Sequence, residues 1–237
     1  MKKELLIFGA NGALGRGLTQ VMLKKDYDKI YLFSSKFDET TNEPSNVERI
    51  IIQDLSKEEN AVDAFKKVYT DKNKILFLYS TIGGFAGGKT IWESEVDEWD
   101  KMFDMNLKTN YLLAKHFAKL IQQSFGGSIC FTAAYTGIQE EAGKGSYGIS
   151  KSALIHLVKT LALESKKINL SVNAIAPYII DTPANRRWMK KEDYSEWIKP
   201  SEIGELVYSL FSNFHFISGN IIKLKYRFEL REGMTNY

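Results

Sequence analysis

The sequence has few residues that form crosslinks or bind metals. It contains one cysteine, Cys130, and three histidines, which lie at least 40 residues apart with no acidic partner at triad spacing. A single cysteine cannot form an internal disulfide, and this histidine spacing fits neither a metal site nor a catalytic triad. We therefore expect no bound metal and a reducing, cytoplasmic setting.

Long apolar runs are also missing, and neither sign of charge is in large excess. The 32 Lys and Arg residues against 29 Asp and Glu give a net charge of +3. An excess this small gives no electrostatic footprint for nucleic acid, although it suits an anionic cofactor. The first apolar run is too short for a signal-peptide core, and no later run approaches a membrane span. We expect neither a nucleic-acid nor a membrane partner.

The composition is that of an ordinary globular chain. Hydrophobic residues make up 44% of the sequence and charged residues 26%, which excludes a disordered or collagen-like protein. A length of 237 residues suits one domain better than two small ones. Because no repeat or linker interrupts the chain, we expect a single domain over residues 1–237.

Short apolar runs alternate with segments of helical periodicity. Strands are predicted at 5–8, 30–33, 50–52, 75–79, 128–132, 170–175 and 221–224, and helices at 13–25, 96–123, 145–165 and 201–212. A further helix follows a predicted capping box at Ser56 and Glu59. Continuously apolar strands indicate burial on both faces. The pattern therefore predicts a doubly wound α/β fold of the Rossmann type, with about seven mainly parallel strands and helices on both faces. The irregular stretch 176–200 predicts a substrate lid.

A glycine-rich loop connects the first predicted strand to the first helix. It reads Gly9-Ala10-Asn11-Gly12-Ala13-Leu14-Gly15. Such glycines permit a tight turn and close approach of the backbone to a pyrophosphate. The helix that follows offers unpaired N–H groups and the positive end of its dipole. The loop therefore predicts a dinucleotide site, the alternative being a plain glycine turn.

Tyr147 and Lys151 lie one turn apart on a predicted helix. A tyrosine with a pKa near 10 is a poor proton donor at neutral pH, and a nearby ammonium lowers that pKa by favouring the phenolate. The pattern alone also fits a solvated helix face. Its place after a fifth strand, in a chain with the glycine loop, favours a catalytic acid and its tuner.

Further motifs occur in a fixed order: Asp54-Leu55, Met105-Asn106-Leu107, residues 172–177 and residues 218–222. With them the chain resembles the short-chain dehydrogenase/reductase family over essentially its whole length. Within that family it most resembles the dihydropteridine reductases, on residues 12–15, 83–88 and 181–186. The resemblance implies an oxidoreductase that uses a nicotinamide cofactor and a small-molecule substrate, and that forms a homodimer or homotetramer.

The resemblance also implies residue roles. Tyr147 would donate the proton, Lys151 would tune it and bind a ribose, and Asn106 would hold a water of a proton relay. The candidate substrate-contacting residues are Ala134, Tyr178 and Trp188. Cofactor contacts are implied for Gly9, Asn11, Gly12, Ala13, Leu14, Gly15, Ser34, Ser35, Lys36, Asp54, Leu55, Gly83, Gly84, Lys151, Pro177, Ile180 and Thr182.

The chain departs from the family pattern at one catalytic position. The family has a serine thirteen residues before the tyrosine, and Ala134 stands there. Dihydropteridine reductases also lack this hydroxyl, whereas Asn106 resembles the wider family and not that group. The alternatives are that Thr132 or Thr136 replaces the serine, or that the chain is a poor catalyst.

The end of the second predicted strand bears on the cofactor. NAD-selective enzymes place a carboxylate there to bind the ribose hydroxyls, but this chain has Ser34, Ser35 and Lys36, with no acid before Asp38. Hydroxyls and an ammonium can bind a 2′-phosphate, and Arg16 adds charge nearby. We expect a preference for NADP(H), with NAD(H) possible.

The resulting hypothesis is hydride transfer from the reduced cofactor to a small flat acceptor such as a quinonoid dihydropterin. One alternative is a ketone reductase of the same family, in which Thr132 or a water replaces the serine. Another is a non-catalytic cofactor-binding regulator, which would require neither Tyr147 nor Lys151.

Overall fold

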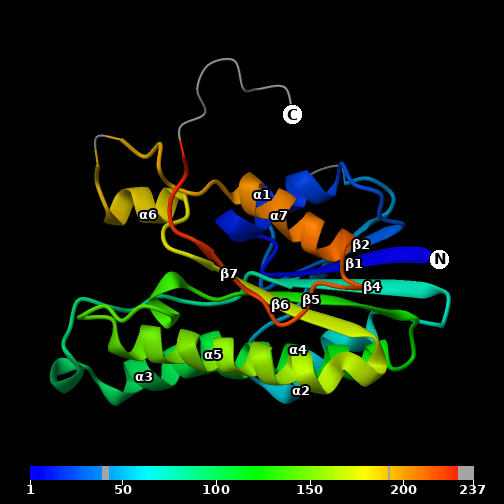
Figure 1. Cartoon of the computed structure of the whole chain (residues 1–237), viewed down its shortest axis with the longest axis horizontal. Helices are drawn as coiled ribbons and strands as arrows, with labels where there is room; N and C mark the ends of the chain where they lie inside the picture. Colours follow the sequence, from blue (N-terminus) through cyan, green and yellow to red (C-terminus); the bar gives the residue numbers. More distant parts are fainter. Residues whose placement is uncertain (39–42, 192, 229–237) are drawn as a thin grey trace.

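The computed structural model describes residues 1–38, 43–191 and 193–228. Seven strands form one parallel sheet in the order β3-β2-β1-β4-β5-β6-β7 (Figure 1). The strands are β1 Lys2–Phe8, β2 Lys29–Ser34, β3 Val47–Ile51, β4 Lys74–Ser80, β5 Gly126–Thr132, β6 Leu170–Pro177 and β7 Ile221–Leu224. This arrangement confirms the predicted doubly wound α/β fold.

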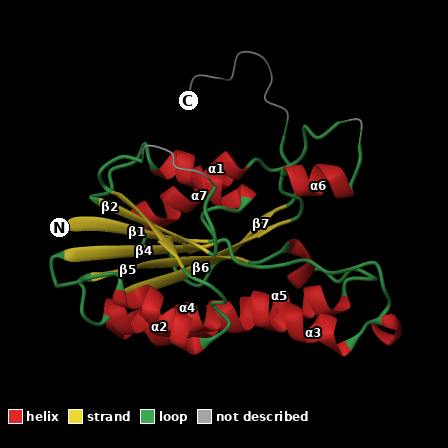
Figure 2. Ribbon diagram, turned by 180° about the vertical axis from the view of Figure 1, so that it is seen from behind, coloured by secondary structure: helices red, strands yellow, loops and turns green. Residues whose placement is uncertain are grey.

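Helices cover both faces of the sheet. Helices α1 and α7 pack on one face and α2, α4 and α5 on the other, while α6 lies beyond the strand ends (Figures 1 and 2). The helices are α1 Ala13–Met22, α2 Glu58–Lys66, α3 Val96–Phe103, α4 Thr109–Ile121, α5 Gly145–Glu164, α6 Pro183–Trp188 and α7 Pro200–Ser212. Among the described residues, no helix has both the length and the apolar character needed to cross a membrane.

The core has two halves, one on each face of the sheet. Successive residues of a strand point to opposite faces, so Leu6 and Phe8 enter the half beneath α2, α4 and α5. Leu5 and Ile7 enter the half beneath α1 and α7. Phe8 also stacks on Phe33 of β2, with ring centroids 4.3 Å apart. The continuous apolar strands are therefore explained by burial on both sides.

The helix predicted at 96–123 is interrupted in its middle. A π-helical turn, Asp104–Lys108, separates α3 from α4. Two side chains bind backbone carbonyls around this wider turn: the Thr109 hydroxyl donates to the Asp104 carbonyl at 2.9 Å, and the Asn110 amide donates to the Asn106 carbonyl at 2.9 Å. Hydrophobic periodicity is blind to this insertion, since the flanking helices continue on nearly the same axis.

The predicted capping box at Ser56 and Glu59 is wrong. Helix α2 begins at Glu58 with Lys57 as its N-cap, and no side chain caps it. The Ser56 hydroxyl instead donates to Asp54 Oδ1 at 2.5 Å. Asp54 has a φ of +29°, and the turn there brings its carboxylate back onto Ser56. Ser56 therefore belongs to the turn after β3 and lies outside the helix.

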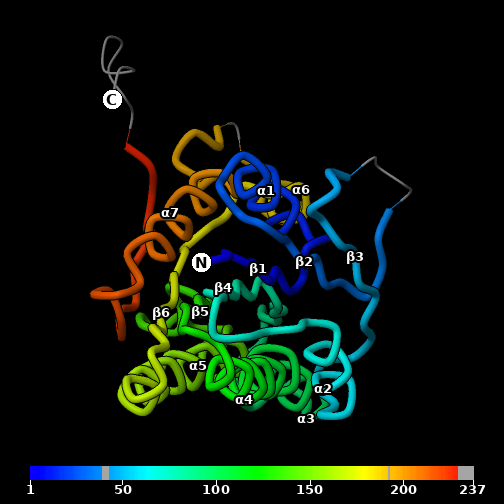
Figure 3. The backbone as a smooth tube through the Cα atoms, turned by 90° about the vertical axis from the view of Figure 1, so that its right-hand side faces the viewer, coloured from blue at the N-terminus to red at the C-terminus, as the bar shows by residue number. Residues whose placement is uncertain are grey.

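The strand order places a crevice at one edge of the sheet. The chain leaves β1 toward β2 on one side, and β4 returns on the other side of β1 (Figure 3). Phe8, at the end of β1, lies beside Phe33 of β2 and Ser80 of β4. The loops after these strands therefore diverge at the same edge, where open α/β sheets bind ligands.

Candidate active site

The larger cavity at this edge has a volume of about 700 Å³. Its walls come from the loops that follow β1, β2, β3 and β4 and from the helical run that begins with α3. The predicted cofactor residues among its lining are Gly9, Ser34, Ser35, Asp54 and Leu55. The structure thus brings together residues that lie up to 46 positions apart in the sequence.

The glycine loop is built for close backbone approach. Gly9 has a φ of +80°, and a Cβ there would lie 2.3 Å from the Thr81 Oγ1 atom. Helix α1 begins at Ala13 with Gly12 as N-cap, and no side chain caps it. The N–H groups of its first turn are therefore oriented for an anionic ligand. None of the predicted residues 11–15 lines the cavity itself.

An acidic wall on the cavity was not predicted. Asp97, Asp100 and Asp104 line it together with Lys101. Their spacing of three and four residues places the carboxylates on one helix face, and that spacing is a signal the sequence does contain. Carboxylates accept hydrogen bonds and do not donate them, so this wall suits amino groups better than phosphates.

The basic residues expected to bind a 2′-phosphate, Lys36 and Arg16, do not line the cavity. Lys36 is exposed and does not line the cavity. The Arg16 guanidinium is 2.9 Å from Asp38 Oδ2. The Gln53 side chain donates to the Ser35 carbonyl at 2.7 Å, which fixes the loop beside them. Arg16 is thus already engaged by a carboxylate.

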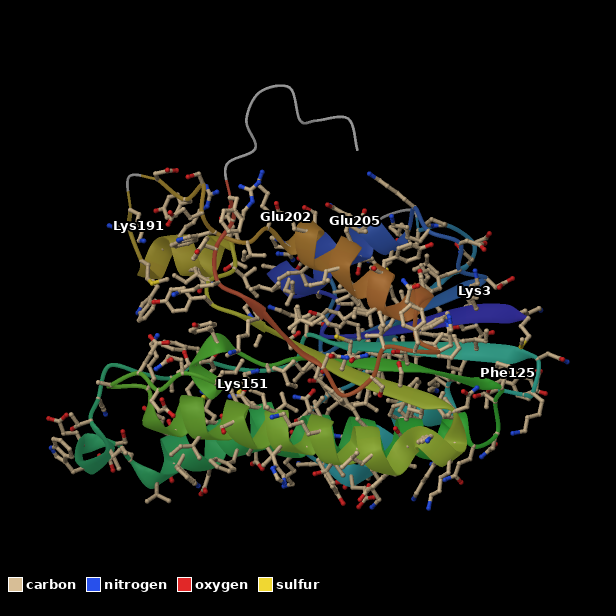
Figure 4. The ribbon with its side chains drawn as sticks, viewed as in Figure 1. Lys3, Phe125, Lys151, Lys191, Glu202 and Glu205 are labelled. Atoms are coloured by element: carbon tan, nitrogen blue, oxygen red, sulfur yellow. The ribbon has the colours of Figure 1, made fainter. Side chains whose placement is uncertain are left out.

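Tyr147 and Lys151 occupy one face of α5, as predicted. Lys151 is buried, and Figure 4 shows it on the side of α5 next to the sheet. Its ammonium donates to the Thr132 carbonyl of β5 at 2.8 Å. A Cβ on Gly83 would lie 2.7 Å from both Lys151 Nζ and Asn106 Oδ1. Only glycine lets the loop after β4 pass this close to the two predicted catalytic residues.

Asn106 links that loop to α5. Its Oδ1 atom accepts from the Gly84 N–H at 2.8 Å, and its Nδ2 atom donates to the Gly84 carbonyl at 3.1 Å. Nδ2 also donates to Ser150 Oγ at 3.0 Å, and that hydroxyl donates to the Tyr147 carbonyl at 2.8 Å. The π-helical turn therefore delivers a fully buried asparagine to the predicted catalytic helix.

The protonation behaviour of the pair differs from the expectation. Burial lowers the pKa of Lys151 to about 7. Burial, with a smaller contribution from the Glu141 carboxylate, raises the pKa of Tyr147 to about 12. The predicted lowering of the tyrosine pKa by the lysine is wrong for the cofactor-free chain. The reason is that both groups are taken out of water, which disfavours each charged form.

The two candidate replacements for the missing serine behave differently. The Thr132 hydroxyl lies 2.8 Å from both the Tyr79 hydroxyl and the Ser80 carbonyl, and Tyr79 belongs to the core beneath α1 and α7. Thr132 therefore faces away from α5, and its proposed substitution for the serine is wrong. Thr136 donates to Glu141 at 2.6 Å on the α5 side. Ala134 is buried and leaves its position without a hydroxyl.

A second cavity, of about 320 Å³, opens at Tyr147. Tyr178 and Trp188, both predicted to contact substrate, line it, whereas Ala134 does not. Phe85 packs edge-on against Tyr147 and Trp188, with ring centroids 5.0 Å apart in each case. Three aromatic side chains, Phe85, Tyr178 and Trp188, thus line this cavity together with the predicted acid. This geometry suits a flat substrate.

The whole arrangement has known counterparts. The sequence model of the family described as short chain dehydrogenase matches residues 3–193. The chain belongs to the short-chain dehydrogenase family. It is therefore an oxidoreductase by family, and the glycine loop and the Tyr147–Lys151 pair lie within the matched region.

Individual relatives of this short-chain dehydrogenase match over nearly their full length. A dihydropteridine reductase of Dictyostelium discoideum is 28% identical over 241 residues, covering 100% of this chain and 99% of that protein. Carbonyl reductase family member 4 of Xenopus laevis is 24% identical, covering 94% and 96%. The solved structure "ElxO with NADP Bound" has a TM-score of 0.81 at 23% identity, covering 95% and 98%. That likeness confirms the fold.

The stretch after β6 of this dehydrogenase contains three more predicted residues. Pro177 ends β6, and Thr182 caps α6 by accepting from the Asn185 N–H at 3.2 Å. The Asn185 side chain donates to the Ile180 carbonyl at 2.8 Å. None of Pro177, Ile180 and Thr182 lines either cavity. Within the described residues, no group of three His, Cys, Asp or Glu side chains is placed to hold a metal.

The sequence reasoning missed Phe85 and Lys144, which both line the cavity at Tyr147. An aromatic residue inside the glycine-rich segment 83–88 was one available signal. Lys144 carried a weaker one, since it precedes Tyr147 by three residues and therefore lies about one helical turn away. Neither signal indicates which cavity a side chain enters.

Proposed function

We propose that this dehydrogenase transfers a hydride from NADPH to a quinonoid dihydropterin or a similar flat, electron-poor acceptor. The observation that carries the proposal is the aromatic cavity at Tyr147, in a chain whose buried Ala134 leaves the family's serine position without a hydroxyl. The Dictyostelium discoideum relative named as a dihydropteridine reductase supports the same substrate class. Tyr147 would donate the proton.

The number of hydrogen-bond donors supports this choice of acceptor. A ketone oxygen gains negative charge as hydride arrives, and losing one positioned donor costs on the order of 10²–10³-fold in rate. With Ala134 in place of serine and Thr132 bound on the other face of the sheet, Tyr147 remains as the family's donor. A quinonoid ring is already electron-poor, so one donor suffices for it.

The residues present fit a nicotinamide dinucleotide. The left-handed Gly9 and the uncapped start of α1 make the cradle for the diphosphate. The acidic wall of Asp97, Asp100 and Asp104 suits the exocyclic amine of adenine. Lys151, Ile180 and Thr182 would contact the nicotinamide half. When bound, the cofactor supplies the hydride.

A preference for NADP(H) over NAD(H) is part of the proposal. Described residues 29–38, from β2 into the following loop, contain no carboxylate before Asp38. Ser34 and Ser35 line the cavity, Lys36 follows them in the chain, and Arg16 pairs with Asp38. A 2′-phosphate would compete with Asp38 for the Arg16 guanidinium and gain charge-assisted hydrogen bonds. The NADP named in the ElxO structure is consistent with this preference.

We also propose that residues 176–200 act as a lid within one domain over residues 1–237. Helix α6 brings Trp188 to the cavity and is tied back by a bidentate pair between Arg186 and Asp181, at 2.5 and 2.7 Å. Residue 192 lies outside the described part of this lid. A lid of this kind excludes water from the reacting atoms.

A homodimer or homotetramer in the cytoplasm completes the proposal. Ile91, Trp92 and Val96 have exposed fractions of 73%, 85% and 72%. An open groove of about 360 Å³ is lined by Ile91 and Val96, by Trp99 of α3 and by Ile149 of α5. Exposed apolar patches of this kind mark interfaces. We expect a Trp92→Glu substitution to shift the protein toward a smaller assembly in light scattering.

One observation favours the ketone reductase as a second candidate. Asn106 is fully buried and bridges Gly84 to Ser150 at the catalytic helix, as the proton relay of the wider family would require. The carbonyl reductase relative from Xenopus laevis points the same way.

Steady-state reduction of a quinonoid dihydropterin, simple ketones and quinones, each with NADPH and NADH, decides between these functions. The proposed function predicts dihydropterin turnover with little ketone turnover. Efficient ketone reduction without dihydropterin reduction would establish the second candidate. No turnover of any acceptor, with tight cofactor binding, would leave a non-catalytic regulator.

A further inference from the structure

A charged cluster forms one wall of the cavity at Tyr147. The Thr136 hydroxyl donates to Glu141 Oε1 at 2.6 Å, and the Lys144 ammonium donates to Glu141 Oε2 at 2.6 Å. Thr136 and Lys144 both line this cavity, and all three line the neighbouring cavity of about 360 Å³. We call this cluster, Thr136, Glu141 and Lys144, the polar wall. It separates the two cavities.

The polar wall is held in a fixed arrangement by its own bonds. The side chains of Lys144 and Glu141 are each only 24% exposed, so their ion pair is less screened than a surface pair. One carboxylate binds both partners, one on each oxygen. The Lys144 nitrogen and the Thr136 oxygen therefore flank the same carboxylate, each 2.6 Å from one of its oxygens.

These bonds decide what each group offers to a ligand. A hydroxyl has one proton and two lone pairs, so Thr136, whose proton is used by Glu141, faces the cavity as an acceptor. An ammonium has three protons, so Lys144 keeps donors after one binds Glu141. The wall therefore presents a donor beside an acceptor. Glu141 also neutralises the lysine charge, which disfavours an anion as the ligand.

The walls beside it require a planar ligand. The Lys144 ammonium lies 6.0 Å from the centroid of the Phe85 ring, and Phe85 is in edge contact with Tyr147 and Trp188. A ring lying between these aromatics would bring one edge against the polar wall. Its opposite side would face the Tyr147 hydroxyl.

We propose that the polar wall binds the lactam edge of a planar heterocycle, an N–H adjacent to a C=O. Lys144 donates to the carbonyl oxygen and Thr136 accepts from the ring N–H. Glu141 is the positioning residue that holds both groups in these roles. The proposal rests on the proposed function only in taking the cavity at Tyr147 as the substrate site, and it makes a cyclic amide the feature that selects substrates.

Equilibrium binding of non-reacting ligands tests the wall separately from turnover. Isoquinolin-1(2H)-one carries the lactam edge, and isocoumarin is the same bicycle with a ring oxygen in place of the N–H. Titration calorimetry of the full chain saturated with NADP⁺ gives both dissociation constants. We expect the lactam to bind about 10-fold tighter than isocoumarin. Isocoumarin cannot donate to Thr136, so it loses that hydrogen bond and leaves the Thr136 acceptor unpaired.

Matched variants assign that ratio to individual atoms. Thr136→Val is close in shape and removes the acceptor together with the bond to Glu141. The ratio should fall to about 1, while isocoumarin binding stays unchanged because Lys144 keeps its bond to Glu141. Lys144→Met should weaken both carbonyl compounds about 10-fold, because each loses a charge-assisted hydrogen bond. Lys159→Met removes an exposed lysine of α5, the helix that follows Lys144, and should change neither constant. NADPH fluorescence confirms that each variant is folded and loaded.

Glu141→Gln tests whether the wall's preference for ligand charge changes. With the lysine charge no longer neutralised, the variant should bind 2-naphthoate about 10-fold tighter than the unmodified chain does, while binding the lactam more weakly. A positioning role requires both changes, whereas a merely structural role would weaken all ligands alike.

Several results would overturn the polar-wall proposal. They are equal binding of the lactam and isocoumarin, no binding of either, and a ratio that survives Thr136→Val. The proposed function fails differently, through absence of dihydropterin turnover. A chain that discriminates the lactam but does not reduce dihydropterin keeps the wall and loses the function, and the reverse result keeps the function and loses the wall.

Discussion

The two cavities of this short-chain dehydrogenase are built in different ways. The 700 Å³ cavity lies at the ends of β1, β2, β3 and β4. Close approach of the backbone to a ligand there depends on a left-handed Gly9 and on the uncapped start of α1. The 320 Å³ cavity is lined by side chains from the loop after β4, from both sides of the start of α5 and from the segment after β6. The first site depends on the backbone conformation of the strand-end loops, and the second depends on side-chain packing between separate segments.

This difference explains why the first cavity needs only features common to the fold, whereas the second needs particular side chains of this chain. Backbone groups at strand ends are placed by the sheet itself, so any sequence that forms the sheet and keeps the glycines builds the first site. The second site depends on Phe85, Lys144 and Trp188, whose positions are set by packing between segments far apart in the sequence. The variants below each affect one site and should leave the other unchanged.

The largest effect is expected from Tyr147→Phe. Loss of the hydroxyl should lower turnover by about 10²–10⁴-fold, the range of general acid catalysis, while the NADPH dissociation constant stays the same. Stopped-flow hydride transfer and a fluorescence titration measure the two quantities. Full turnover in this variant would show that the proton comes from water, and weaker NADPH binding would show that the two sites are not separable.

A second test restores the family's missing donor through Ala134→Ser. A serine hydroxyl there should raise ketone reduction by about 10-fold or more and raise dihydropterin reduction much less, because the ketone depends more on a second donor. The ratio of kcat/KM for the two acceptors is the measurement. Equal changes for both acceptors would mean that Ala134 does not govern acceptor choice.

The cofactor cavity is tested by Lys36→Glu. A carboxylate at the end of β2 should repel a 2′-phosphate and accept from ribose hydroxyls, which lowers the ratio of NADPH to NADH affinity by about 10-fold. Asp38→Asn makes the opposite test, since it frees Arg16 from its 2.9 Å contact and should raise the ratio. An unchanged ratio in Lys36→Glu would remove Lys36 from the cofactor site.

The smallest effect concerns the stability of the cofactor-free chain. The pKa of Lys151 is about 7 when folded and near its ordinary 10.5 when unfolded. Between these values the unfolded chain holds more protons, so stability should rise with pH from about 7 to about 10 and be independent of this group below 7. Urea unfolding at about pH 7 and about pH 8 should show a gain of order 1 kcal/mol.

Two variants isolate that gain. Lys151→Met should abolish it, because the titrating group is gone. Lys159→Met, an exposed position of α5, should retain it. The same slope in all three proteins would show that Lys151 keeps its ordinary pKa in the folded chain.

Much of the fold followed from local pattern. The seven apolar runs became the seven strands, because burial on both faces leaves a continuous apolar signature. The π-helical turn at Asp104–Lys108 did not follow, since it depends on the side-chain bonds of Thr109 and Asn110. The capping box at Ser56 failed because Asp54 competes for the same hydroxyl.

The sequence by itself determined the parallel sheet, the glycine loop and the pairing of Tyr147 with Lys151. These features need only residues that are close in the chain or strands that share one edge. Tertiary structure alone decided that Thr132 faces the opposite core, that burial raises the pKa of Tyr147, and that Lys144 joins Phe85 at the second cavity. The reason is physical: spacing fixes which residues share a helix face, whereas solvent exclusion and contacts between distant segments exist only after the chain has packed.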